Sequence, residues 1–226
     1  SKNLHNGLSH DLIICDGDAE FCDAAKNAFA ALECQVVHGL LEQQRQSDAV
    51  VWPGNCHGLP TSGLDHAMSS WLGPEVLNEV RNQIDLTYGD VGMPSGATMI
   101  VNVHALSGLP DQGGALLDGV RYVIYVAVFP KSFGIAKLAM TKVLEAAEGL
   151  TGGQEGAGVC AAAPLRCLAC PGLGTFRGSM DVSEIARMMA EAVGEFAGRR
   201  AGASAGAGGM SACSASAAAS SSGAWS

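Results

Sequence analysis

Short apolar runs alternate with segments of helical periodicity along most of the chain. Six apolar runs have the length of a buried strand, and they span residues 12–15, 35–38, 48–52, 98–102, 121–129 and 165–170. Five further segments carry apolar side chains at helical spacing, over residues 19–32, 65–72, 74–84, 135–148 and 181–196. This alternation predicts an α/β fold of three layers (α/β/α), with a mixed, mostly parallel central sheet covered by helices on both faces.

The two ends of the chain differ in composition from the middle. Residues 1–10 are mostly polar, and residues 199–226 are almost entirely Ala, Gly and Ser. Such a segment cannot bury a core, so we expect a disordered tail over 199–226 and a flexible N-terminus over 1–10. The folded domain is then predicted to span residues 11–198, which is long enough for one medium-sized core.

Two of the predicted strands run directly into glycine-rich loops. The first loop spans residues 53–63 and the second spans residues 171–178, and a predicted helix follows each of them. A strand, a glycine-rich turn and a helix N-terminus together present backbone N–H groups that suit phosphate or another anion. Two such loops in one domain predict a ligand that carries a diphosphate between two recognised ends.

The overall charge narrows the class of ligand. The formal net charge is −9 at pH 7, whereas a protein that binds the nucleic-acid backbone needs a basic face. A small anionic ligand is compatible with this charge, because backbone N–H groups bind anions without Lys or Arg. We therefore expect a small-molecule partner and no nucleic acid.

The cysteines and the apolar runs indicate the compartment. Most of the eight cysteines lie inside apolar runs, which favours buried, reduced thiols over a disulfide framework. Cys167 and Cys170 have a C-x-x-C spacing, but inside a strand their side chains would point to opposite faces, so we expect no metal site. No apolar run approaches the roughly 20 residues that span a bilayer. We expect a monomeric, intracellular, cytoplasmic protein without a membrane span or a cofactor.

The residues of both loops resemble those of macro domains, the ADP-ribose-binding family. The segment Asp48-Ala-Val-Val-Trp-Pro-Gly-Asn55 resembles the strand and Asn-containing loop of that family, and Ser62-Gly63-Leu64-Asp65 resembles its glycine-rich turn. The segment Ala169-Cys-Pro-Gly-Leu-Gly-Thr175 resembles the second, diphosphate-binding loop of the macro-like branch. Both motifs occur in order, each after a strand, and the similarity extends over about residues 12–196.

The resemblance implies that ADP-ribose or an ADP-ribosylated substrate binds in a cleft between the two loops. Asn55 would hydrogen-bond the distal ribose, and Asp65 or a water near it would act if the protein hydrolyses ADP-ribosyl linkages. These two are therefore the candidate catalytic residues, and whether any linkage is cleaved stays open. The expected ligand-binding residues are Asp16, Asn55, Ser62, Gly63, Pro171, Gly172, Leu173, Gly174, Thr175, Phe176, Arg177 and Gly178.

The chain departs from the family pattern in both regions that would hold the ligand. Leu40, in the segment His38-Gly39-Leu40-Leu41, stands where the family has the Asp that recognises adenine. Asp16 or Asp18 is the alternative for that role. Phe176 stands where the second loop of the family commonly has Gly.

Two other functions stay open. The domain could be a degenerate module that keeps the fold and serves as a reader without catalysis, or an unrelated doubly wound hydrolase or nucleotide-sugar binder. Both candidate catalytic residues also have a simpler interpretation, in which Asn55 only caps a turn and Asp65 only caps the helix that it begins. We expect Trp52, just before the first loop, to fill the core.

Overall fold

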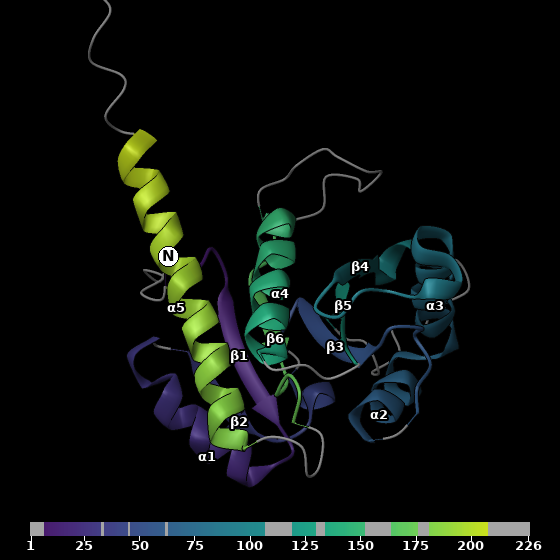
Figure 1. Ribbon diagram of the computed structural model, residues 1–226, viewed down its shortest axis with the longest axis horizontal. Coiled ribbons are helices and arrows are strands. Elements are labelled where there is room, and N and C mark those ends of the chain that lie inside the picture. Colours follow the sequence, from purple (N-terminus) through teal and green to yellow (C-terminus); the bar gives the residue numbers. More distant parts are fainter. Residues whose placement is uncertain are drawn as a thin grey trace, which may run out of the picture.

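The computed structural model describes residues 7–32, 34–44, 46–61, 63–106, 119–129, 134–151, 164–175 and 181–207. This part of the chain contains six strands and five α-helices (Figure 1). The strands are β1 (Asp11–Asp16), β2 (Gln35–His38), β3 (Ala49–Asn55), β4 (Thr98–Asn102), β5 (Tyr122–Phe129) and β6 (Cys167–Cys170). The helices are α1 (Ala19–Ala28), α2 (Gly63–Leu72), α3 (Pro74–Tyr88), α4 (Ile135–Thr151) and α5 (Val182–Ala207). Each element corresponds to one predicted from the sequence.

The strands form one sheet in the order β2-β1-β6-β3-β5-β4. All neighbouring pairs are parallel except β4 with β5, which is antiparallel. The last strand along the chain, β6, is inserted between β1 and β3. The carboxyl ends of β1, β6, β3 and β5 therefore lie at the same edge of a mixed, mostly parallel sheet, as predicted.

Successive residues of each strand enter two separate cores. Ile14 and Val51 belong to a core that includes residues of α1, α4 and α5, whereas Ile13 and Trp52 belong to a core that includes residues of α2 and α3. In Figure 1, α4 and α5 lie side by side, and α2 and α3 lie together apart from them. The fold is the predicted three-layer α/β/α arrangement. Trp52 is fully buried, as expected for a core residue.

The two cysteines of the C-x-x-C spacing confirm the predicted strand geometry. Cys167 packs in the core under α2 and α3, and Cys170 packs in the core under α1, α4 and α5. The cysteines in the described ranges are free, namely Cys15, Cys22, Cys34, Cys56, Cys167 and Cys170. In the same part of the chain, no three His, Cys, Asp or Glu side chains are grouped so that they could hold a metal ion. None of the described helices has both the length and the apolar character needed to cross a bilayer.

Several helices end at other residues than predicted. α1 ends at Ala28, and Ala30–Leu32 forms a separate 3₁₀ turn. α5 continues to Ala207 rather than stopping at residue 196, since alanine favours helix and Arg200 pairs with Glu148 of α4. Residues 199–207 of the expected tail are therefore helical. Residues 208–226 lie outside the described part, and the disordered tail remains a prediction there.

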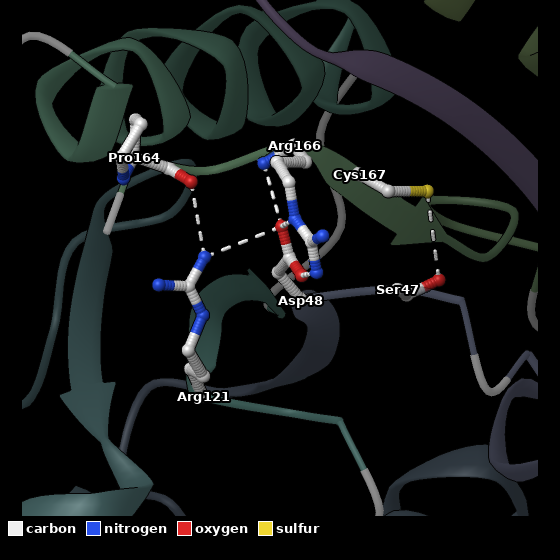
Figure 2. A network of polar contacts seen from close by, with 6 residues as sticks. All are labelled: Ser47, Asp48, Arg121, Pro164, Arg166 and Cys167. Atoms are coloured by element: carbon white, nitrogen blue, oxygen red, sulfur yellow. Dashed lines mark hydrogen bonds and ion pairs between the residues drawn. The ribbon is translucent and has the colours of Figure 1, made fainter. Parts of the chain in front are cut away.

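A buried carboxylate ties together the starts of three neighbouring strands. Asp48 directly precedes β3, and its side chain is only 3% exposed. The carboxylate accepts hydrogen bonds from the backbone N–H of Arg166, at 2.6 Å, and from its guanidinium, at 2.9 Å, while the Arg121 guanidinium lies 3.3 Å away (Figure 2). Arg166 precedes β6 and Arg121 precedes β5. Burial by itself would raise the pKa of Asp48, but the hydrogen bonds from Arg166 outweigh it and hold that pKa below its usual value.

Replacing Asp48 should therefore destabilise the fold in a pH-dependent way. We expect Asp48→Asn to lower the free energy of unfolding at pH 7 by about 1–3 kcal/mol, because the charged acceptor of several hydrogen bonds is lost. Since the pKa is lowered in the folded state, the difference from wild type should be complete above the ordinary value of 3.8 and shrink as the pH falls below it. Urea titrations at several pH values measure this difference.

The matched control is Asp23→Asn, which removes a carboxylate that is 75% exposed on α1. We expect little change in stability from this control. A destabilisation by Asp48→Asn that stayed constant from neutral to strongly acidic pH would contradict the assigned role of the Asp48 charge.

Candidate functional site

A cavity of about 1330 Å³ opens at the edge of the sheet where the parallel strands end. β1 contributes Asp16, β3 contributes Asn55, β5 contributes Phe129, and the turn after β6 contributes Gly172 and Thr175. Ligands of open α/β sheets bind beyond the carboxyl ends of the strands, so this cavity is the candidate binding site. The described lining consists of Asp16, Gly17, Asp18, Ala19, Pro53, Gly54, Asn55, Cys56, His57, Leu59, Thr61, Gly63, Leu64, Asp65, Phe129, Gly172 and Thr175.

The side chain of Asn55 shapes the first loop from inside. Its Oδ1 accepts the backbone N–H groups of His57, at 3.0 Å, and Leu59, at 3.2 Å, and its Nδ2 donates to the carbonyl of Leu59. Both acceptor positions of the amide oxygen are therefore used, and one N–H of the amide has no partner among the residues that the structure describes. Asn55 stabilises the turn, which was the simpler of its two predicted roles, and it also lines the cavity.

The floor of the first loop is a tight contact between Gly54 and Tyr125. The Tyr125 hydroxyl donates to the carbonyl of Asn55, at 2.7 Å. Burial raises the pKa of Tyr125, so the hydroxyl stays protonated and remains a donor. A side chain at position 54 would overlap with the phenol ring, which explains why glycine is needed there.

Asp65 is held beside the same loop by two donors. α2 begins at Gly63, so Asp65 lies inside the first turn of the helix and does not cap its start. Asp65 is 5% exposed, and its carboxylate accepts hydrogen bonds from the indole N–H of Trp52, at 2.8 Å, and from the backbone N–H of Thr61. Burial raises the pKa of Asp65, and these two hydrogen bonds only partly oppose the shift.

The second loop is fixed to the core and to the end of β1. Leu173 is fully buried, and its N–H donates to the sulfur of Met189, at 3.4 Å. Gly174 has a φ of 95°, a conformation that favours glycine. The N–H of Gly172 donates to the Asp16 carboxylate, at 2.9 Å, and this bond links the turn to β1.

The structure brings the two predicted loops to one cavity. Of the expected ligand-binding residues, those in the described lining are Asp16, Asn55, Gly63, Gly172 and Thr175, together with the candidate catalytic residue Asp65. Pro171, Leu173 and Gly174 belong to the second loop but are buried and do not contribute to this lining. Ser62, Phe176, Arg177 and Gly178 lie outside the described residues, so their roles remain predictions.

The sequence did not single out Phe129, Gly17 or Ala19, which also line the cavity. Phe129 is the last residue of β5, and 37% of it is exposed. Gly17 and Ala19 lie where β1 passes into α1. All three residues lie at or just after the end of a predicted strand. That position indicates a cavity residue only when the order of the strands in the sheet is known.

The charges of the described lining are acidic. Asp16, Asp18 and Asp65 contribute carboxylates, and no Lys or Arg belongs to the lining formed by the described residues. A phosphate group bound there would depend on backbone N–H groups or on residues outside the described ranges.

Comparisons with known proteins identify the fold. No family model matches the sequence, and a search of curated proteins finds no match. Among solved structures, the Oceanobacillus iheyensis macrodomain with MES bound superimposes with a TM-score of 0.51 at 14% identity, over 68% of this chain and 71% of that one. The same macrodomain with ADP gives a TM-score of 0.51 at 14% identity, over 68% and 70%. The macrodomain of Mycobacterium tuberculosis DarG gives 0.51 at 16% identity, over 70% and 88%.

These likenesses define the class of fold. At such low identities they show the fold and not the ligand. The chain has the macrodomain fold, as the resemblance of the two loops predicted.

The contact beneath the first loop generates a prediction about stability. We expect Gly54→Ala to lower the free energy of unfolding by roughly 1–3 kcal/mol or more, because the added methyl group must displace the ring of Tyr125. Gly149→Ala, on α4, is the matched control, because a Cβ added at this position has no neighbouring atom within 4 Å. Since alanine favours helix more than glycine does, this control should raise the free energy of unfolding by roughly 0.5–1 kcal/mol. Thermal and urea unfolding measure both, and a Gly54→Ala protein as stable as wild type would show that the contact is absent.

Proposed function

We propose that the cavity binds ADP-ribose or a closely related nucleotide diphosphate. The observation that carries the proposal is that Asn55 of the first loop and Thr175 of the second loop line one cavity at the carboxyl edge of the sheet. Its volume of about 1330 Å³ exceeds the range of roughly 300–1,000 Å³ typical of small-ligand pockets, so a ligand with two ends has room. The Oceanobacillus macrodomain of the same fold was solved with ADP, which supports a nucleotide as the ligand.

The donors that remain in the two loops suggest which part of the ligand each loop would bind. The second loop, of which Thr175 lines the cavity, would hold the diphosphate through N–H groups at the end of its turn. Asn55 would donate its remaining amide N–H to a ribose hydroxyl, because its oxygen is already occupied by the loop. Phe129 offers an apolar surface against which a ring could pack.

A titration with ADP-ribose tests the proposal. We expect wild type to bind with a dissociation constant at or below roughly 1 mM, seen as heat in calorimetry and as a rise in melting temperature. Thr61→Trp places a large side chain in the cavity lining and should weaken binding at least about tenfold. Thr87→Trp, at an exposed position of α3 outside the lining, should leave binding unchanged.

The absence of both heat and a melting shift with wild type would overturn the proposal. Equal affinities of the two tryptophan variants would place the ligand elsewhere on the protein.

Asp65 favours a second candidate function, the hydrolysis of an ADP-ribosyl linkage. A buried carboxylate with a raised pKa, held in place at the wall of a cavity, has the properties of a general base. In this case an ADP-ribosylated ester would turn over, and Asp65→Asn should lower the rate by roughly a hundredfold or more while ADP-ribose still binds. Release of ADP-ribose, measured by chromatography beside the calorimetric titration, separates chemistry from binding. If wild type binds ADP-ribose without any turnover, the domain is instead a binding module without catalysis.

A further inference from the structure

The carboxylate of Asp16 occupies a group of backbone N–H donors at the edge of the cavity. Its Oδ1 accepts the N–H of Asp18, at 2.9 Å, and its Oδ2 accepts the N–H of Gly172, also at 2.9 Å. These donors come from two segments that are 156 residues apart in sequence, the β1–α1 junction and the turn after β6.

This arrangement is that of a bound anion, except that the anion is part of the chain. An ionised carboxylate accepts about four hydrogen bonds, and each oxygen of Asp16 accepts one from a backbone N–H. The turn is built closely around it, because a side chain at position 172 would lie 3.0 Å from Asp16 Oδ2 and overlap with the Thr175 methyl group. Asp16 is thus in contact with the one turn that places Thr175 in the cavity lining.

A neighbouring carboxylate occupies the next donors in the same way. The Asp18 side chain accepts the N–H groups of Glu20, at 2.9 Å, and Phe21, at 3.4 Å, at the start of α1. The N-terminus of α1 is an otherwise suitable place for a phosphate. Two of its donors, the N–H groups of Glu20 and Phe21, are already bound by Asp18.

We propose that Asp16 is a positioning residue, an internal anion that fixes the second loop to the end of β1 for ligand binding. In this role Asp16 acts through the loop that it holds. The inference rests on the proposed function for its effect on ADP-ribose, whereas the link between Asp16 and Gly172 stands without any ligand.

Chemical rescue tests the positioning role. Asp16→Ala empties the donor group, and we expect the dissociation constant for ADP-ribose to rise at least about tenfold. Because Asp16 lines the cavity, acetate can reach the vacated donors, and an excess of sodium acetate should restore part of the affinity. Sodium chloride at the same ionic strength should not. Asp23→Ala, which removes an exposed charge of α1, should bind like wild type in both salts.

Unchanged affinity in Asp16→Ala, or a loss of affinity that acetate leaves as it is, would overturn the proposal. A merely structural effect of the substitution would not respond to a small carboxylate.

A second measurement uses the wild-type protein without ligand, so it does not depend on whether a variant folds. Burial raises the pKa of Asp16, so the amide resonances of Gly172 and Asp18 in wild type should titrate together with a shared midpoint above 3.8. Separate midpoints, or no titration of the Gly172 amide, would overturn the link. If wild type fails to bind ADP-ribose but the two amides titrate together, the proposed function fails while the assignment of Asp16 to the second loop holds.

Discussion

The parallel pairing of β1, β6 and β3 is the constraint on which the site depends. β6 comes last along the chain, yet it pairs with β1 through Ile13 opposite Ala169 and with β3 through Ala49 opposite Leu168. This insertion brings the loop after β6 next to the loop after β3, although more than a hundred residues separate them. Because all three strands point the same way, both glycine-rich loops emerge at one edge and enclose one cavity.

The polar groups of that edge are largely satisfied by one another. Asp16 binds the second loop, Asn55 binds its own loop, and Asp65 is held by Trp52. Such internal hydrogen bonds cost some of the free donors that a ligand could use, but they hold the loops in a single geometry before the ligand arrives. At the opposite ends of the strands, Asp48 fixes the starts of β3, β5 and β6 in the same manner.

Much of the fold could be predicted because local patterns reflect burial. The strand at Cys167–Cys170 was predicted with its two cysteines on opposite faces, and the structure places them in opposite cores. Helix ends were less predictable, since they depend on contacts. The extension of α5 to Ala207 is an example, because the pair of Arg200 with Glu148 joins residues 52 apart in sequence.

The sequence by itself determined the alternation of strands and helices, the two glycine-rich loops and the resemblance to macro domains, since hydrophobic spacing and turn residues act over short distances along the chain. Only the tertiary structure decided that β6 lies between β1 and β3, and that the carboxylate of Asp16 binds the N–H of Gly172. The physical reason is that strand order and long-range hydrogen bonds depend on how distant segments bury one another, and no short segment carries that information.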